Sequence, residues 1–197
     1  MTGVTAKHSV GTYSRYVDIK RISLSTSALV AGVTLTLPGV APAEATSSLF
    51  PVDCQTNNVV LDEDGGNYQL YGTCGVVTVT GDNVTVAHLP ATRTLVVEGQ
   101  GDTINGKPVD RVVVRGRGNQ VTVRSSRITR VASPGSTVRV TGLLETARVT
   151  GDRSRLRAER LTELFVDGDR NVVRADRGQT LVSNDGHHNR ISVHRRA

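Results

Sequence analysis

The sequence predicts an all-β fold, a single-stranded parallel β-helix (β-solenoid) of seven to eight coils with about 17–18 residues per coil. Three observations predict it: two hydrophobic columns share one period, apolar and polar residues alternate within each column, and turn residues recur at that same period. The alternation is typical of strands, and the segments are too short and too β-branched for helices. A two-strand unit of this size cannot bury its own apolar face, so successive units are expected to stack.

The first hydrophobic column places one anchor in each coil, at steps of 20, 17, 17, 18, 17 and 18 residues: Val84, Ile104, Val121, Val138, Leu156, Val173 and Ile191. The second column is a pair of residues, stepping by 16 to 18: Val59/Leu61, Val77/Val79, Leu95/Val97, Val112/Val114, Thr129/Val131, Ala147/Val149, Leu164/Val166 and Thr180/Val182. An antiparallel sandwich or barrel is the alternative architecture. The constant period disfavours it, because antiparallel loops vary in length.

A polar residue stands two positions before each anchor of the first column, in the order Asp82, Asp102, Asn119, Ser136, Ser154, Asn171 and Asn189. Short amide, carboxylate and hydroxyl side chains satisfy backbone groups in turns. We therefore expect this column to stack at a corner of the solenoid and to be structural.

The N-terminal region has the features of an export signal. Lys20 and Arg21 precede a mildly apolar stretch over 22–37, and small residues over 41–45 supply cleavage sites. The sequence therefore predicts a signal peptide at 1–45 and a β-helix domain at 46–197, with no transmembrane span after processing. A buried or membrane helix is the alternative for this stretch, and its Ser, Thr and β-branched residues disfavour it.

Two cysteines, Cys54 and Cys74, fall in the predicted mature chain. An exported protein meets an oxidising compartment, where an even pair usually forms a disulfide. We expect such a bridge to close the N-terminal end of the solenoid and the protein to be secreted or extracytoplasmic, in the cell envelope. Two free buried thiols are the alternative.

A family resemblance rests on this cysteine pair, on the Gly-Gly-Asn-Tyr-Gln-Leu-Tyr-Gly-Thr segment at 65–73 that it encloses, and on repeated units like Gly-Asp-Asn-Val-Thr-Val at 81–86. In these features the chain resembles secreted actinobacterial proteins, many of them mycobacterial, grouped as domain of unknown function 3060. The resemblance covers about residues 52 to 195. It implies a β-helical fold and no established activity, so it assigns no catalytic residue.

Charge is distributed unevenly along a chain whose formal net charge is +6 and whose aromatic content is only 3%. Residues 46–110 hold 2 basic and 8 acidic groups, whereas residues 111–197 hold 18 basic and 8 acidic groups. Few aromatic rings are present to stack bases, so we expect no specific nucleic-acid partner. The predicted rod is electrically polar.

Strand alternation predicts which arginines point outward. Arg139, Arg157 and Arg174 follow their anchors on successive coils, about 4.8 Å apart. The candidate binding residues for an anionic ligand are Arg130, Arg139, Arg148, Arg155, Arg157, Arg174 and Arg190. Arginine suits phosphate and carboxylate, so an anionic cell-envelope polymer or lipid headgroups are the expected partners. The alternative is a solvated face balanced by Asp152, Glu159, Glu163, Asp167, Asp169 and Asp176.

We expect no enzymatic activity, no cofactor and no metal site. The chain has no nucleophile elbow, phosphate-binding loop or His-Glu-x-x-His motif. The segment 184–189 with its two histidines is the sharpest metal candidate, and exposed turn residues explain it more simply. A small polysaccharide-processing lyase or hydrolase is the alternative function. It requires a pair of carboxylates outside the corner columns that meet in a groove.

Overall fold

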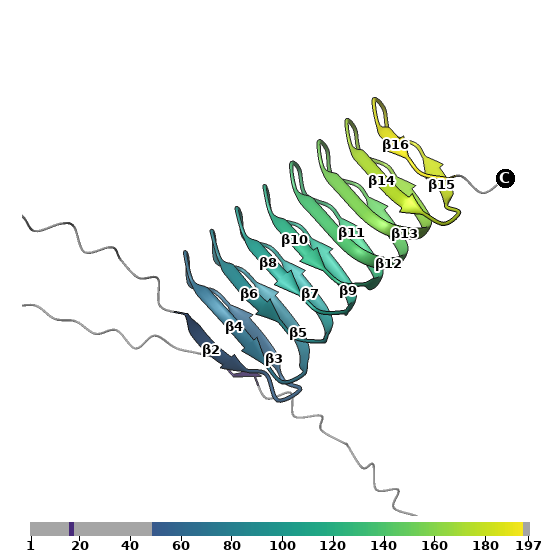
Figure 1. Ribbon diagram of the computed structural model, residues 1–197. Coiled ribbons are helices and arrows are strands. Elements are labelled where there is room, and N and C mark those ends of the chain that lie inside the picture. Colours follow the sequence, from purple (N-terminus) through teal and green to yellow (C-terminus); the bar gives the residue numbers. More distant parts are fainter. Residues whose placement is uncertain (1–15, 18–48, 195–197) are drawn as a thin grey trace, which may run out of the picture.

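A computed structural model describes residues 16–17 and 49–194, and it shows a parallel β-solenoid of about eight coils (Figure 1). Every strand pair is parallel, and each coil lies on the previous one along a single axis. None of the described residues forms a helix, so none of them supplies a helix able to span a membrane. The predicted fold class is confirmed.

The strands form one continuous parallel sheet that runs from one side of the solenoid to the other through β12 (Thr137–Val149) and β13 (Arg155–Val166), and we name the two sides face 1 and face 2. Face 1 contains β2 (Phe50–Asp53), β4 (Asn67–Tyr71), β6 (Thr85–Leu89), β8 (Thr103–Gly106), β10 (Gln120–Val123), the first parts of β12 (Thr137–Val149) and β13 (Arg155–Val166), β14 (Val172–Arg177) and β16 (Arg190–Ser192). Face 2 contains β1 (Tyr16–Val17), β3 (Asn58–Leu61), β5 (Cys74–Val79), β7 (Thr92–Val97), β9 (Val109–Val114), β11 (Ser126–Val131), the last parts of β12 and β13, and β15 (Leu181–Asn184).

The predicted signal peptide, residues 1–45, lies outside the described residues except for β1. This strand pairs in parallel with β3, through Tyr16 with Asn58 and Val17 with Val59.

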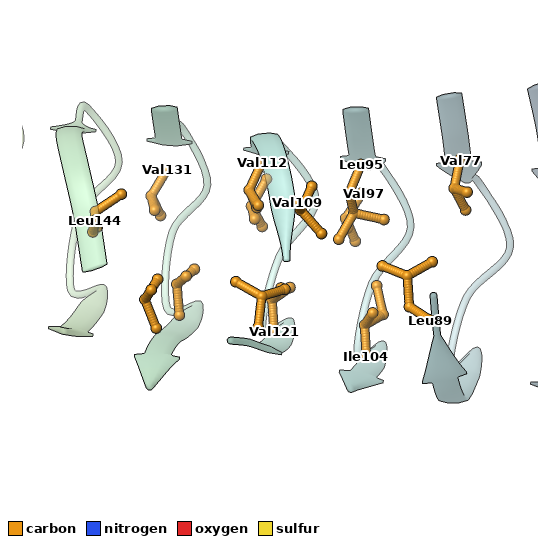
Figure 2. Packing of buried hydrophobic residues seen from close by; sticks show 14 of the residues in the cluster. Val77, Leu89, Leu95, Val97, Ile104, Val109, Val112, Val121, Val131 and Leu144 are labelled. Carbon is orange, nitrogen blue, oxygen red and sulfur yellow. The ribbon is translucent and has the colours of Figure 1, made fainter. Parts of the chain in front are cut away.

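The core is the narrow space between the two faces, and it is filled by aliphatic side chains. Ile104 and Val121 from face 1 meet Leu95, Val112 and Val131 from face 2 (Figure 2). All five are at most 1% exposed. Fully burying one such side chain is worth about 1.5–3 kcal/mol, so this interior supplies most of the stabilisation of the repeat.

The register of the first column differs from the prediction at its N-terminal end. Val86, and not Val84, pairs with Ile104, which restores a step of 18 residues. Val84 instead occupies the corner position predicted for Asp82, and it is fully buried there. The error arose because Val84 and Val86 are two residues apart in one alternating segment. Either valine therefore fits the hydrophobic period.

The second column is also displaced by two residues in its last coil. Leu164 pairs with Val182 and Val166 with Asn184, whereas the predicted pair was Thr180/Val182. Thr180 is nevertheless buried, because its hydroxyl donates to the backbone oxygen of Leu161 at 2.7 Å. The sequence pattern does not distinguish this buried, hydrogen-bonded threonine from a core residue, which explains the displaced prediction.

Polar side chains form a ladder along one corner, as the sequence predicts. The backbone N–H of Val84 donates to Oδ1 of Asp102 at 2.9 Å, and the N–H of Asp102 donates to Oδ1 of Asn119 at 2.8 Å. The pattern continues when the N–H of Asn171 donates to Oδ1 of Asn189 at 2.7 Å. Each link satisfies a corner N–H that would otherwise lack a partner.

The same corner contains a residue with left-handed backbone in every coil. These positions are Gly65, Asn83, Gly101, Gly118, Gly135, Arg153, Arg170 and His188, with φ between 53° and 72°. For a residue with a Cβ this conformation costs roughly 1–2 kcal/mol, which explains the glycines but not the two arginines.

A disulfide joins Cys54 to Cys74 near the N-terminal end, with the two Cα atoms 4.9 Å apart. Both cysteines are buried, and no free cysteine is present among the described residues. The predicted pairing is confirmed. A disulfide indicates an oxidising, extracytoplasmic environment.

Candidate functional site

Three arginines lie side by side on the outer surface of face 1. Arg139 of β12 pairs in register with Arg157 of β13, which pairs in register with Arg174 of β14. All three side chains are exposed. Strand alternation puts them outward because their neighbours Val138, Leu156 and Val173 fill the core.

One carboxylate holds two of these arginines. Oδ2 of Asp176 lies 3.0 Å from Nη2 of Arg157, and Oδ1 lies 2.7 Å from Nε of Arg174. Hydrogen bonds from these two guanidinium groups hold the pKa of Asp176 below its usual value. Arg139 makes no ion pair with any described residue.

A shallow depression of about 140 Å³ opens beside this column. It is lined by Arg139, Val140, Thr141, Arg157, Ala158, Glu159 and Asp176. Glu159 is itself paired with Nη1 of Arg177 at 3.2 Å. The depression therefore brings cationic groups together with two carboxylates that already have arginine partners.

Arg155 and Arg190 lie on the same face in the next outward column. Arg155 pairs with Val172, and Val172 pairs with Arg190, so an exposed valine separates the two arginines. Together these five exposed side chains form what we call the arginine face: Arg139, Arg155, Arg157, Arg174 and Arg190.

The other two candidate arginines lie on face 2. Arg130 and Arg148 pair in register, and Phe165 follows them in the same column. Arg148 bonds to Oδ2 of Asp167 through both Nε and Nη2, at 3.1 and 2.8 Å. The structure therefore divides the seven candidates into a group of five and a separate pair.

Sequence reasoning missed the basic residues at the left-handed corner, Arg153 and Arg170. They directly border the arginine face, because Arg153 precedes Arg155 by two residues and Arg170 precedes Val172 by two. Both are exposed. The signal that could have found them is the period itself, since they stand 18 and 35 residues after the corner glycine Gly135.

The corner aspartates are engaged with backbone. Oδ1 of Asp152 accepts the N–H of Asp169, and Oδ1 of Asp169 accepts the N–H of His187, at 2.8 and 2.7 Å. The latter bond holds the pKa of Asp169 below its usual value. Within residues 49–194, no group of three or more His, Cys, Asp or Glu residues is arranged to hold a metal ion.

The carboxyl group with the largest pKa change lies in the corner ladder, two coils before Arg139. Asp102 is fully buried in the corner ladder, and burial raises its pKa from 3.8 to about 6. Its Oδ2 has no hydrogen-bond partner. The equivalent Asn119 uses its amide nitrogen to donate to the backbone oxygen of Gly99 at 2.8 Å. Asp102 is thus a structural residue with one unsatisfied oxygen.

The fold defines the class of the protein as a disulfide-bonded parallel β-solenoid. Residues 131–188 match the model of a family described as a protein of unknown function (DUF3060), in agreement with the resemblance seen in the sequence. These residues include all of β12, β13, β14 and β15, and four of the five arginines of the arginine face. No curated protein and no solved structure matched the chain.

Proposed function

We propose that the chain is an exported, non-enzymatic interaction module of the cell envelope whose arginine face binds a linear anionic polymer. The observation that carries this proposal is the in-register column Arg139, Arg157 and Arg174. Like charges on neighbouring strands repel one another, and an anion laid along the column relieves that repulsion.

A polymer is favoured over a single small anion because the cations are spread over successive coils. Neighbouring strands lie about 4.8 Å apart, so the column presents charges at a constant repeat along the solenoid axis. Asp176 neutralises part of this charge, but it bonds with Arg157 and Arg174 at the exposed surface. Exposed ion pairs are weak, at about 0–1 kcal/mol, so a polyanion can compete with the carboxylate.

The test compares two triple variants that remove the same charge. Arg139, Arg157 and Arg174 are changed to Gln in one variant, and Arg93, Arg111 and Arg127 are changed to Gln in the other. The control arginines are exposed and lie outside the arginine face. Retention is measured on an immobilised anionic glycan, on vesicles with anionic lipids and on DNA.

We expect the first variant to lose retention on the anionic glycan and the control to keep it. Equal retention of both variants would overturn the proposal, because net charge alone would then explain binding. Strongest retention on vesicles would identify lipid headgroups as the ligand instead. Retention on DNA equal to that on the glycan would show non-specific electrostatic binding and contradict a dedicated site.

One observation favours a second candidate, a small polysaccharide-processing enzyme. Glu159 and Asp176 lie outside the corner columns and line one depression. A general acid needs a raised pKa, whereas the pKa of Asp176 is held low by its arginines. Release of reducing ends from acidic glycans by the protein, abolished in a Glu159→Gln, Asp176→Asn variant, would favour this candidate.

A further inference from the structure

The last three coils place basic side chains where the backbone favours glycine. Arg153, Arg170 and His188 have φ values of 53°, 55° and 57°. Equivalent positions in other coils are Gly65, Gly101, Gly118 and Gly135. A residue with a side chain is strained in this conformation, so the arginines reduce stability relative to glycine.

Nothing in the packing of the corner calls for a large side chain. A Cβ built on Gly118 or Gly135 meets no atom within 4 Å, so this position opens onto solvent. Arg153 and Arg170 are exposed, and neither makes an ion pair with another residue of the described segment 49–194. A strained residue without a structural role is a candidate for a functional one.

The corner arginines extend the arginine face sideways. Arg155 and Arg157 alternate along β13, roughly 7 Å apart on its outer side. Arg153 lies in the turn two residues before Arg155 and is also exposed. On the next coil Arg170 and Arg174 repeat this arrangement. Hydrogen bonds between coils hold the corner in register, from the N–H of Arg153 to the oxygen of Asp169 and from the N–H of Arg170 to the oxygen of His187, both at 2.9 Å.

We propose that Arg153 and Arg170 form a second row of contacts to the same linear polyanion, at the left-handed corner beside the arginine face. This inference rests on the proposed function and adds residues to its site. The ligand chemistry is a chain bearing phosphate, sulfate or carboxylate groups, bound by guanidinium forks along the solenoid axis. Glycine at these two positions would relieve the backbone strain but would remove the contacts of Arg153 and Arg170 with the polyanion.

The test is the double variant Arg153→Gly, Arg170→Gly in the full chain, with heparin as the linear polyanion probe. We expect two opposite effects: Tm rises by a few degrees as strain is relieved, and affinity for heparin falls at least about five-fold. Loss of two ionic contacts also reduces the slope of log affinity against log salt by roughly one to two.

Two control variants separate charge from strain. Asn83→Gly relieves left-handed strain in a coil without corner arginines, so Tm is expected to rise with unchanged affinity. Arg153→Lys, Arg170→Lys keeps both charge and strain, and it is expected to keep the Tm and most of the affinity.

Unchanged heparin affinity in the double glycine variant would overturn the inference. If the variant Arg139→Gln, Arg157→Gln, Arg174→Gln loses affinity in the same assay, only the corner row has failed. If that triple variant also binds like the unmodified protein, the proposed function itself has failed. An equal loss of affinity in Asn83→Gly would show that corner rigidity, and not the arginine charge, controls binding.

Discussion

The first and the last coils of the solenoid share one interior but differ in their outer surface. Aliphatic side chains fill the core from Leu61 to Val166, and the same kind of corner hydrogen bond joins Val84 to Asp102 and Asn171 to Asn189. Outside, residues 46–110 carry 2 basic groups and residues 111–197 carry 18. The interior and the corner fix the coil, so the outward positions are free to acquire a separate function.

The largest expected effect concerns the N-terminal coils, which the Cys54–Cys74 disulfide stabilises. Closing a loop of this length removes unfolded-state entropy worth about 3 kcal/mol. We expect Cys54→Ser, Cys74→Ser to lower the free energy of unfolding by about that amount. Urea unfolding of the variant, beside the original protein with and without reductant, measures it. A variant as stable as the oxidised protein would show that the end coils need no covalent closure.

A second difference between the regions is the acid in the corner ladder, Asp102, where later coils have Asn or Ser. Because burial raises its pKa to about 6, the folded protein keeps a proton that the unfolded chain releases near pH 4. The free energy of unfolding therefore falls as pH rises from about 4 to about 6 and stays lower above that range. We expect Asp102→Asn to raise stability at pH 8 by about 2–3 kcal/mol.

The matched control for this prediction is Asn119→Asp, one coil further along. It introduces a second buried acid, so it is expected to destabilise the protein at pH 8 and much less at pH 4. Urea unfolding of both variants at the two pH values tests the pair. If Asp102→Asn gives no gain at pH 8, the carboxylate must be stabilised by a partner, in conflict with its unsatisfied Oδ2.

On the arginine face the analogous question is how strongly Asp176 competes with a ligand. Replacing it in Asp176→Asn frees Arg157 and Arg174 from their ion pairs. We expect affinity for heparin to rise about three-fold, in keeping with the small energy of exposed pairs. Asp110→Asn, a change to an exposed carboxylate of β9 on face 2, serves as the comparison. An equal rise in heparin affinity in both variants would show that net charge causes it. Unchanged affinity in Asp176→Asn would show that Asp176 does not compete with the ligand.

The smallest effect lies at the left-handed position of an N-terminal coil. Asparagine tolerates this conformation better than arginine does, so Asn83→Gly is expected to add only about 0.5 kcal/mol to the free energy of unfolding. Arg153→Gly, measured beside it by urea unfolding, is expected to gain about 1 kcal/mol. A larger gain in the free energy of unfolding for Asn83→Gly than for Arg153→Gly would show that the strain is greater in the N-terminal coil.

Most of the fold could be predicted from the sequence because the period is visible in the core residues. Val121, Val138 and Leu156 are spaced by the length of a coil, and alternation alone put Arg139 and Arg157 outside. The disulfide followed from the number of cysteines and the predicted compartment. These inferences succeeded because each depends on a local pattern repeated in every coil.

The errors fall where two alternatives have the same local pattern. Val84 and Val86 are both buried valines, and only backbone pairing distinguishes the corner from the core. Arg153 and Arg170 were missed because their left-handed backbone is invisible in the sequence. The bridging role of Asp176 depends on side-chain geometry across two coils, which no spacing rule supplies.

In the proposed function the polyanion is bound by the charge of the arginine face, and not by the net charge of the protein. The most direct measurement is the slope of log affinity for heparin against log salt for the two triple variants. We expect the slope to fall by roughly two to three in the variant Arg139→Gln, Arg157→Gln, Arg174→Gln. The slope is expected to stay unchanged in the variant Arg93→Gln, Arg111→Gln, Arg127→Gln. Equal slopes for the two variants would show that net charge, and not the arginine face, determines polyanion binding.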